Sequence, residues 1–133
     1  MEEFCVVCNQ PIPKERQRYN TKFCSNRCKV RQRLALYHEK NPKPQLCHAT
    51  SGIVSEYRVI IDLLFKGYDV FHATSPASSC DLAVLKNNKL LRIEVRTGKY
   101  SAIGNVYKPT ANVRADILAT VLHDRIIYEP DLP

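Results

Sequence analysis

Two closely spaced cysteine pairs near the N-terminus constrain this chain more than any other feature. The first pair is Cys5-x2-Cys8, and the second, Cys24-x3-Cys28, follows after fifteen residues. Two such pairs supply the four soft ligands that a tetrahedral zinc ion prefers. The pattern therefore predicts a structural zinc site, because four thiolates leave no open position for a reactive water.

Two disulfides are the alternative use of these four cysteines. Disulfides are typical of secreted proteins, but the chain begins with the acidic Met1-Glu2-Glu3 and no apolar signal-peptide core follows. No apolar run reaches the roughly 20 residues that span a membrane. We therefore expect a soluble protein that is cytoplasmic, of bacterial, archaeal or phage type, or otherwise intracellular. Cys47 and Cys80 lack close partners, and we expect ordinary reduced thiols there.

The positive charge is concentrated in the first part of the chain. The formal net charge is +7, and residues 1–50 hold ten Lys and Arg against four Asp and Glu, a net of +6. Residues 51–133 hold ten against nine, a net of +1. A basic module next to a nearly neutral domain favours a polyanionic partner, and nucleic acid is the leading candidate. A solvated basic surface without a partner is the alternative.

The pattern of prolines and apolar residues predicts three regions. Residues 1–41 form the zinc-binding module, residues 42–50 a stiff proline-containing linker, and residues 51–133 a second domain. Within the module, a helix is expected from Ser25, its N-cap, to about Glu39.

The second domain is predicted to be α/β (α+β), with a mixed sheet flanked by helices. A helix from Ser51 to Lys66 comes first and ends at Gly67. The apolar side of this helix is expected to consist of Ile53, Tyr57, Ile60, Ile61 and Leu64. Residues 98–113 are expected to form a long functional loop. The expected strands are residues 68–71, 81–86, 89–96, 115–122 and 125–128.

Two acids fall at matching places on the predicted hairpin of this domain. Asp81 begins one strand, and Glu94 lies near the end of its partner, two residues before Arg96. Side chains alternate along a strand, so Glu94 and Arg96 share a face while Val95 points into the core. Two carboxylates, a backbone carbonyl and waters make a suitable Mg²⁺ site, and such an ion activates water for attack on phosphorus. A structural ion pair with Arg92 or Arg96 is the alternative.

These residues resemble the core of the PD-(D/E)xK nucleases over roughly residues 51–128. The resemblance depends on Gly52-x3-Glu56, Gly67-Tyr-Asp-Val70, Cys80-Asp-Leu-Ala-Val84 and Ile93-Glu-Val-Arg-Thr-Gly98, in that order. In layout the chain is similar to archaeal-type Holliday junction resolvases and to intron-associated endonucleases of that superfamily. The resemblance implies a restriction-endonuclease-like fold and DNA as the substrate.

The same resemblance assigns roles to four residues. Asp81 and Glu94 would hold Mg²⁺, and Glu56 would be a third ligand or orient water. Arg96 stands where the family usually has lysine, and arginine stays charged, so it suits a phosphate clamp rather than a base. Lys99, three residues further on, is a candidate to compensate and to contact DNA. Alternatively, Glu56 is an ordinary surface residue of its helix, and Arg96 only neutralises the charge of Glu94.

Phe23-Cys24-Ser25-Asn26-Arg27-Cys28-Lys29 and the basic helix after it resemble a treble-clef zinc motif, in which nucleic-acid binding is common. Arg27, Lys29, Arg31 and Arg33 are the predicted phosphate contacts of this helix. His48, His72 and His123 stand alone in the sequence and receive no role.

Together these features favour a Mg²⁺-dependent DNA endonuclease whose zinc module aids DNA binding. By resemblance we expect a homodimer, since cutting two strands needs two active centres, and no membrane partner. A catalytically inactive DNA-binding protein that keeps the nuclease fold is the alternative. A zinc-dependent interaction protein without a nucleic-acid role is the third interpretation.

Overall fold

The computed structural model describes residues 2–42, 46–107 and 114–133. The chain divides into two compact units, one of Met1–Pro42 with Ser101–Asn105 and the other of Lys43–Tyr100 with Val106–Pro133. Residues 43–45 of the expected linker and residues 108–113 of the expected loop lie outside the described residues. The division into residues 1–41, 42–50 and 51–133 stays a prediction.

The described residues of the first unit form two helices and several short turns. An isolated bridge joins Phe4 to Pro11 and closes the first turn, and a one-turn helix, α1 (Lys14–Gln17), follows Pro13. Helix α2 spans Asn26–Lys40, and the Ser25 side chain accepts a hydrogen bond from the Cys28 backbone N–H at 3.3 Å. The expected N-cap is therefore confirmed. Helix α2 has no buried residue.

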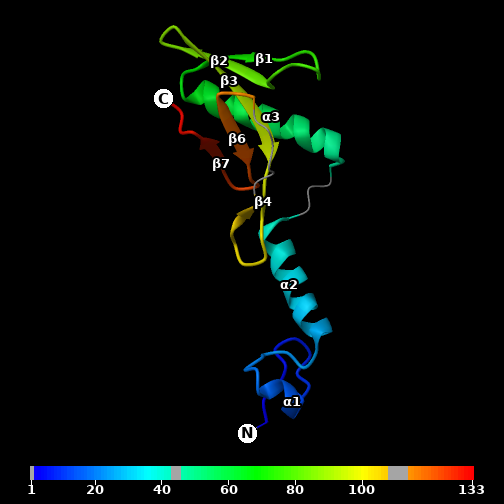
Figure 1. Ribbon diagram of the computed structural model, residues 1–133. Coiled ribbons are helices and arrows are strands. Elements are labelled where there is room, and N and C mark those ends of the chain that lie inside the picture. Colours follow the sequence, from blue (N-terminus) through cyan, green and yellow to red (C-terminus); the bar gives the residue numbers. More distant parts are fainter. Residues whose placement is uncertain (1, 43–45, 108–113) are drawn as a thin grey trace. The chain divides into compact units, whose positions relative to one another are not determined.

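The second unit is a five-stranded mixed sheet that carries one long helix, α3 (His48–Phe65), on one face (Figure 1). The strand order is β1-β2-β3-β6-β7, and only the β3–β6 pair within it is parallel. The predicted mixed α+β fold, preceded by a cysteine-containing module, is confirmed. The strands of this sheet are β1 (Asp69–His72), β2 (Leu82–Lys86), β3 (Lys89–Thr97), β6 (Ile117–Val121) and β7 (Ile126–Glu129).

The hairpin that carries the two acids forms as expected. Asn87 and Asn88 both have positive φ, 52° and 61°, which suits the tight turn between β2 and β3. After β3 the chain passes through Gly98 into a small two-stranded sheet of β4 (Lys99–Tyr100) and β5 (Val106–Tyr107). A Cβ at Gly98 would lie 2.6 Å from Thr120 Cγ2, so this crossing over β6 needs glycine.

The core lies between α3 and the sheet, but the buried side of α3 differs from the one predicted. Ser55, Val59 and Leu63 are its buried residues. Val59 and Leu63 belong to one core cluster with buried sheet residues such as Leu82 and Ile93, and α3 contacts β1, β3 and β6. Of the five residues of the predicted apolar side, Ile60 packs against the core, whereas Ile53, Tyr57, Ile61 and Leu64 are exposed. The helix also begins at His48 rather than Ser51.

Candidate functional site

The four cysteines of the first unit gather into one cluster. Their sulfurs all lie within 4.8 Å of one another, with Cys8 Sγ 3.5 Å from Cys24 Sγ and 3.7 Å from Cys28 Sγ. No disulfide joins them. The first pair sits on a turn closed by the Asn9 N–H, which donates to the Cys5 carbonyl at 2.9 Å. The second pair spans the first turn of α2, so both of its sulfurs reach the same side.

The cluster has the chemistry of a cation site. Burial disfavours the Cys5 thiolate, but hydrogen bonds from the backbone of Cys24, Val7 and Cys8 outweigh it and lower the pKa of Cys5 to about 6. A hydrogen bond with Cys8 raises the pKa of Cys24 to about 12. Four sulfurs this close cannot all be thiolates without a neutralising cation. Four cysteine sulfurs at these separations fit a zinc ion, and zinc is what they would hold.

The three predicted acids of the second unit share one neighbourhood. Asp81 immediately precedes β2, and its Oδ2 accepts a hydrogen bond from the Val95 N–H at 2.7 Å, between Glu94 and Arg96 on β3. Burial raises the pKa of Glu94, and the nearby charges of Asp81 and, more weakly, Glu56 raise it further against the opposing effect of Arg96. The structure thus brings together the carboxylates that the sequence grouped.

Each carboxylate of this group also has a partner within the chain. Arg96 Nη2 lies 2.5 Å from Glu94 Oε1, and the Glu94 side chain is 16% exposed. Glu56 Oε2 lies 2.7 Å from His72 Nε2. Arg92 pairs instead with Asp116 at 3.2 Å. Of the two structural ion pairs that the sequence left open as an alternative, the Glu94–Arg96 pair is present.

The acidic group is looser than the cysteine cluster. Among residues 2–42, 46–107 and 114–133, only the four cysteines bring three or more metal-binding atoms within 4.8 Å of one another. The donors of the acidic group are carboxylate oxygens, which suit Mg²⁺ or Mn²⁺ rather than zinc. Glu56, Asp81 and Glu94 suit a hard divalent cation by donor type, and that Asp81 and Glu94 hold one stays a prediction.

His72 is the residue of this neighbourhood that the sequence did not indicate. It ends β1 opposite Leu82, the residue after Asp81, and its ring lies 6.0 Å from the Tyr57 ring between centroids. The Glu56–His72 contact joins α3 to the edge strand of the sheet. The register of β1 against β2 is the one feature that could have found it, because it aligns the end of β1 with the acid before β2.

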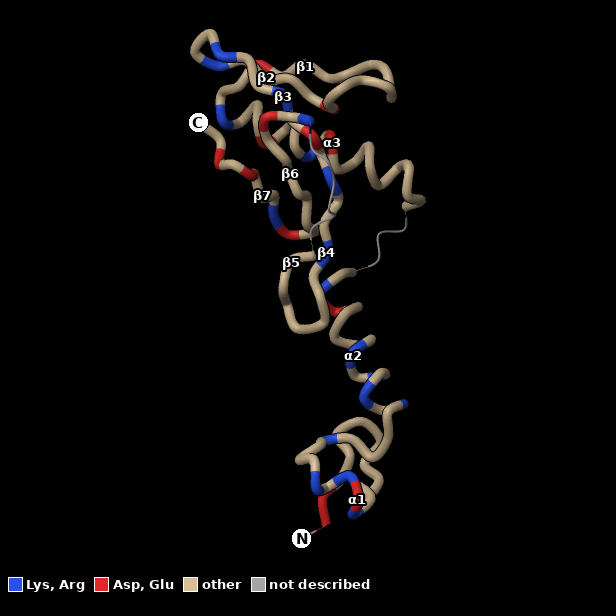
Figure 2. Tube along the Cα trace, viewed as in Figure 1, with Lys and Arg blue, Asp and Glu red and all other residues tan. Residues whose placement is uncertain are grey.

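The remaining predicted residues lie on exposed positions. Figure 2 shows Lys and Arg recurring along α2, and its four predicted phosphate contacts are all exposed: Arg27, Lys29, Arg31 and Arg33. Lys99 is exposed in β4. A phosphate-binding role for these five residues stays a prediction.

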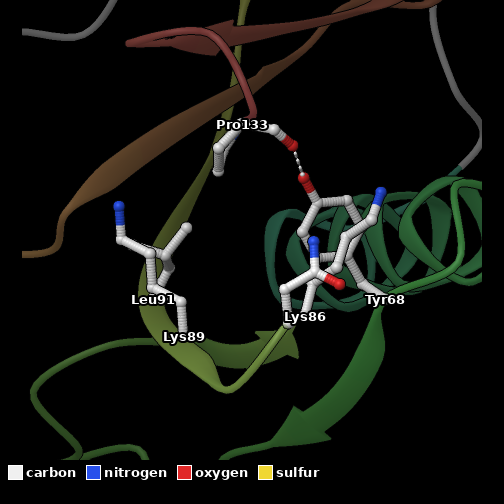
Figure 3. Close-up of a pocket in the computed structure, with 6 residues that line it drawn as sticks. Tyr68, Lys86, Lys89, Leu91 and Pro133 are labelled. Carbon is white, nitrogen blue, oxygen red and sulfur yellow. Dashed lines mark hydrogen bonds between the residues drawn. The ribbon is translucent and has the colours of Figure 1, made fainter.

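A small pocket of about 150 Å³ lies at the turn end of the β2–β3 hairpin, away from the acids (Figure 3). Tyr68 donates a hydrogen bond to the Pro133 carbonyl at 2.5 Å across it. Lys86 Nζ lies 4.4 Å from the centre of the Tyr68 ring. None of the predicted site residues lines this pocket.

Comparison with known proteins supports a nuclease fold. No protein-family model matches the chain, and no curated protein matches it. Among solved structures, the chain is similar to a bacterial homing endonuclease, I-Ssp6803I, with a TM-score of 0.50 and 17% sequence identity. The match covers 59% of this chain and 64% of that one, so it spans less than two thirds of the endonuclease. At this identity the likeness shows a shared fold over the matched part of the two chains.

No helix within the described part of the chain has both the length and the apolar character needed to cross a membrane.

Proposed function

We propose that this protein is a Mg²⁺-dependent DNA endonuclease of the PD-(D/E)xK type. The observation that supports it best is the convergence of Asp81 and Glu94 at one end of the β2–β3 hairpin, in a fold shared with a homing endonuclease. Burial and the neighbouring carboxylate disfavour the ionised form of Glu94. A divalent cation would offset that cost, as one expects of a metal ligand.

The residues of the group have distinct tasks in the proposed reaction. When bound, Mg²⁺ supplies a Lewis acid for the phosphate and lowers the pKa of water. Asp81 and Glu94 hold the cation, and Glu56, steadied by His72, orients the attacking water. Arg96 remains protonated and stabilises the negative charge that develops on the phosphate oxygens.

The zinc module contributes affinity in this proposal. Arg27, Lys29, Arg31 and Arg33 contact phosphates, and Lys99 adds a contact from the nuclease unit. If the four α2 residues each neutralise one phosphate, replacing them with glutamine should reduce the slope of log affinity against log salt by roughly 3 to 4. Because cutting both strands needs two active centres, we further propose that the protein acts as a homodimer.

A cleavage assay with a matched control tests the catalytic proposal. Supercoiled plasmid and a four-way junction are incubated with Mg²⁺ or Mn²⁺ and with wild type, Asp81→Asn, Glu94→Gln or Asp116→Asn. Asp116 is the control because its Oδ2 also accepts a backbone N–H, that of Arg92 at 2.8 Å, outside the acidic group. We expect both site variants to lose at least about 100-fold in rate and Asp116→Asn to cut normally.

The inactive DNA-binding protein remains the second candidate because of one observation. Arg96 neutralises Glu94 directly, which is the contact that a purely structural pair would make. Tight binding of both DNA substrates without cleavage in either cation would favour that candidate. Weak binding without salt dependence would favour an interaction protein that has no nucleic-acid role.

A further inference from the structure

Helix α3 is apolar on two opposite sides. Its buried side is centred on Val59, which is fully buried against the sheet. At 3.6 residues per turn, six large apolar residues occupy an arc of about 120° on the side opposite Val59. We call these residues the outer face of α3: Ile53, Val54, Tyr57, Ile61, Leu64 and Phe65.

The outer face is substantially exposed. Four of its members are 51–54% exposed, Val54 is 40% exposed and Phe65 is 89% exposed. A helix at the surface of a soluble domain normally carries polar residues on its outer side, and a helix that is apolar all round is normally buried. A continuous apolar surface of this extent marks an interaction site.

The charged groups of α3 do not interrupt the outer face, and each already has a partner in the chain. Glu56 contacts His72, and Arg58 donates to the Leu122 carbonyl at 2.7 Å. Asp62 accepts a hydrogen bond from Tyr128 at 2.5 Å and pairs with Lys66. Covering the outer face would therefore remove apolar surface from water without stranding an unpaired charge, which is the favourable case for association.

We propose that a second copy of this chain covers the outer face, with the two α3 helices packed about a two-fold axis. In such an interface each copy contributes the same surface. Two copies of an uncharged face can pack together without repulsion, whereas two copies of a charged face would repel each other. Each exposed side chain offers on the order of 100 Å², so the six supply roughly 600 Å² per copy, against about 800 Å² per partner in a standard interface.

Other partners for the outer face fit less well. One is helix α2, but its exposed apolar residues, Val30 and Leu34, are fewer and alternate with the exposed Lys29, Arg31 and Arg33. Burying them would cost the hydration of those charges. A membrane-surface helix usually carries several Lys and Arg on its polar side, and α3 carries one, Arg58.

This inference names the face used by the proposed homodimer, and it rests on the proposed function only in that respect. The exposure of the outer face does not depend on nuclease chemistry. The test of the interface therefore needs neither DNA nor Mg²⁺, so the two proposals can fail separately. A dimer that does not cut DNA would refute the catalytic proposal alone, and a monomer that cuts would refute the interface alone.

Sedimentation equilibrium of the full zinc-loaded chain tests the interface. The variants are Ile61→Glu and Leu64→Glu on the outer face, with Val30→Glu as the control. Val30 is 54% exposed and Ile61 53%, so both changes place a charge on an equally exposed apolar position. We expect a dimer for wild type and Val30→Glu. For each outer-face variant the dissociation constant should rise at least 100-fold.

Two results would overturn the interface. One is a wild-type protein that stays monomeric up to high micromolar concentration. If that monomer binds vesicles of mixed neutral and anionic lipid, a membrane surface rather than a second copy covers the outer face. The other is an outer-face variant that dimerises as well as wild type. Circular dichroism checks that the variants fold. The second outer-face substitution keeps the test decisive if the first one unfolds.

Discussion

The zinc-binding module should lose its fold when the metal is removed. Among its described residues only Cys5 and Ile12 are buried apolar side chains, 2% and 3% exposed. Burying two such side chains contributes about 3–6 kcal/mol. Ordering a backbone costs roughly 1–2 kcal/mol per residue, so this burial offsets the ordering of only a few residues. A structural zinc ion contributes about 10–16 kcal/mol in comparable small modules, so the metal stabilises the module more than its apolar core does.

Two variants separate the metal from the cysteine substitution itself. Cys8→Ser removes one ligand of the cluster, and Cys47→Ser removes an exposed thiol outside it. We expect one zinc per chain in wild type and Cys47→Ser by elemental analysis. Zinc binding in Cys8→Ser should be at least 100-fold weaker. In amide NMR spectra, chelation should collapse the resonances of residues 2–40 and leave those of the β-sheet in place.

A metal-free module that keeps dispersed resonances and resists proteolysis would show that the metal is not needed for its fold. A Cys47→Ser protein that loses zinc together with Cys8→Ser would also count against it. Collapse of the sheet resonances on chelation would show that the second unit depends on the metal, contrary to its separate core.

Three further predictions concern the acidic group. Arg96→Lys should keep the plasmid-cleavage rate within about tenfold of wild type, because lysine and arginine side chains can both contact a phosphate. Arg96→Ala should lose about 100-fold or more in rate. An equal loss in the two variants would contradict a phosphate-binding role for Arg96. His72→Ala should raise the Mn²⁺ concentration needed for half-maximal cleavage. His72→Asn should raise it less, because asparagine can still donate a hydrogen bond to Glu56. If neither variant changes this concentration, the Glu56–His72 contact has no role in cleavage. Glu94→Gln should raise the melting temperature of the zinc-loaded protein without Mg²⁺ at pH 7, because burial and Asp81 raise the pKa of Glu94 and so make its charged form costly. That gain should vanish as the pH falls below the ordinary carboxyl range near 4, where Glu94 is protonated in both the folded and unfolded states, and a lower melting temperature at pH 7 would reverse the argument.

Local chemistry explains why much of the fold could be predicted from the sequence. The Asn87-Asn88 turn and the strands on either side of it are encoded within about fifteen residues, and so is the Ser25 cap of α2. The grouping of Asp81 with Glu94 follows from the same hairpin, because its register brings the start of β2 beside the middle of β3. None of these steps needs knowledge of a distant part of the chain.

Periodicity failed at α3 for a physical reason. Both Val59 with Leu63 and Tyr57 with Ile61 repeat at helical spacing, so the pattern alone cannot tell which side meets the sheet. Ser55 lies on the buried side, and its hydroxyl is 2.9 Å from Thr97 Oγ1 on β3. That partner is 42 residues away, beyond what a local pattern encodes. Four of the five residues that the sequence grouped, all but Ile60, lie on the outer face.

The Glu94–Arg96 pair leads to one more expectation, that metal and DNA bind cooperatively. Arg96 already neutralises Glu94, so a cation that uses this carboxylate must share it with a guanidinium that cannot lose its proton. Placing a divalent ion beside that guanidinium costs repulsion in the free protein. A DNA phosphate offers Arg96 a second anionic partner and removes the cost.

We therefore expect duplex DNA to tighten Ca²⁺ binding at least tenfold, measured by titration calorimetry. Arg96→Ala should abolish this coupling, because without the guanidinium the cation binds Glu94 equally well with or without DNA. Equal coupling in wild type and Arg96→Ala would show that the phosphate acts on the cation directly.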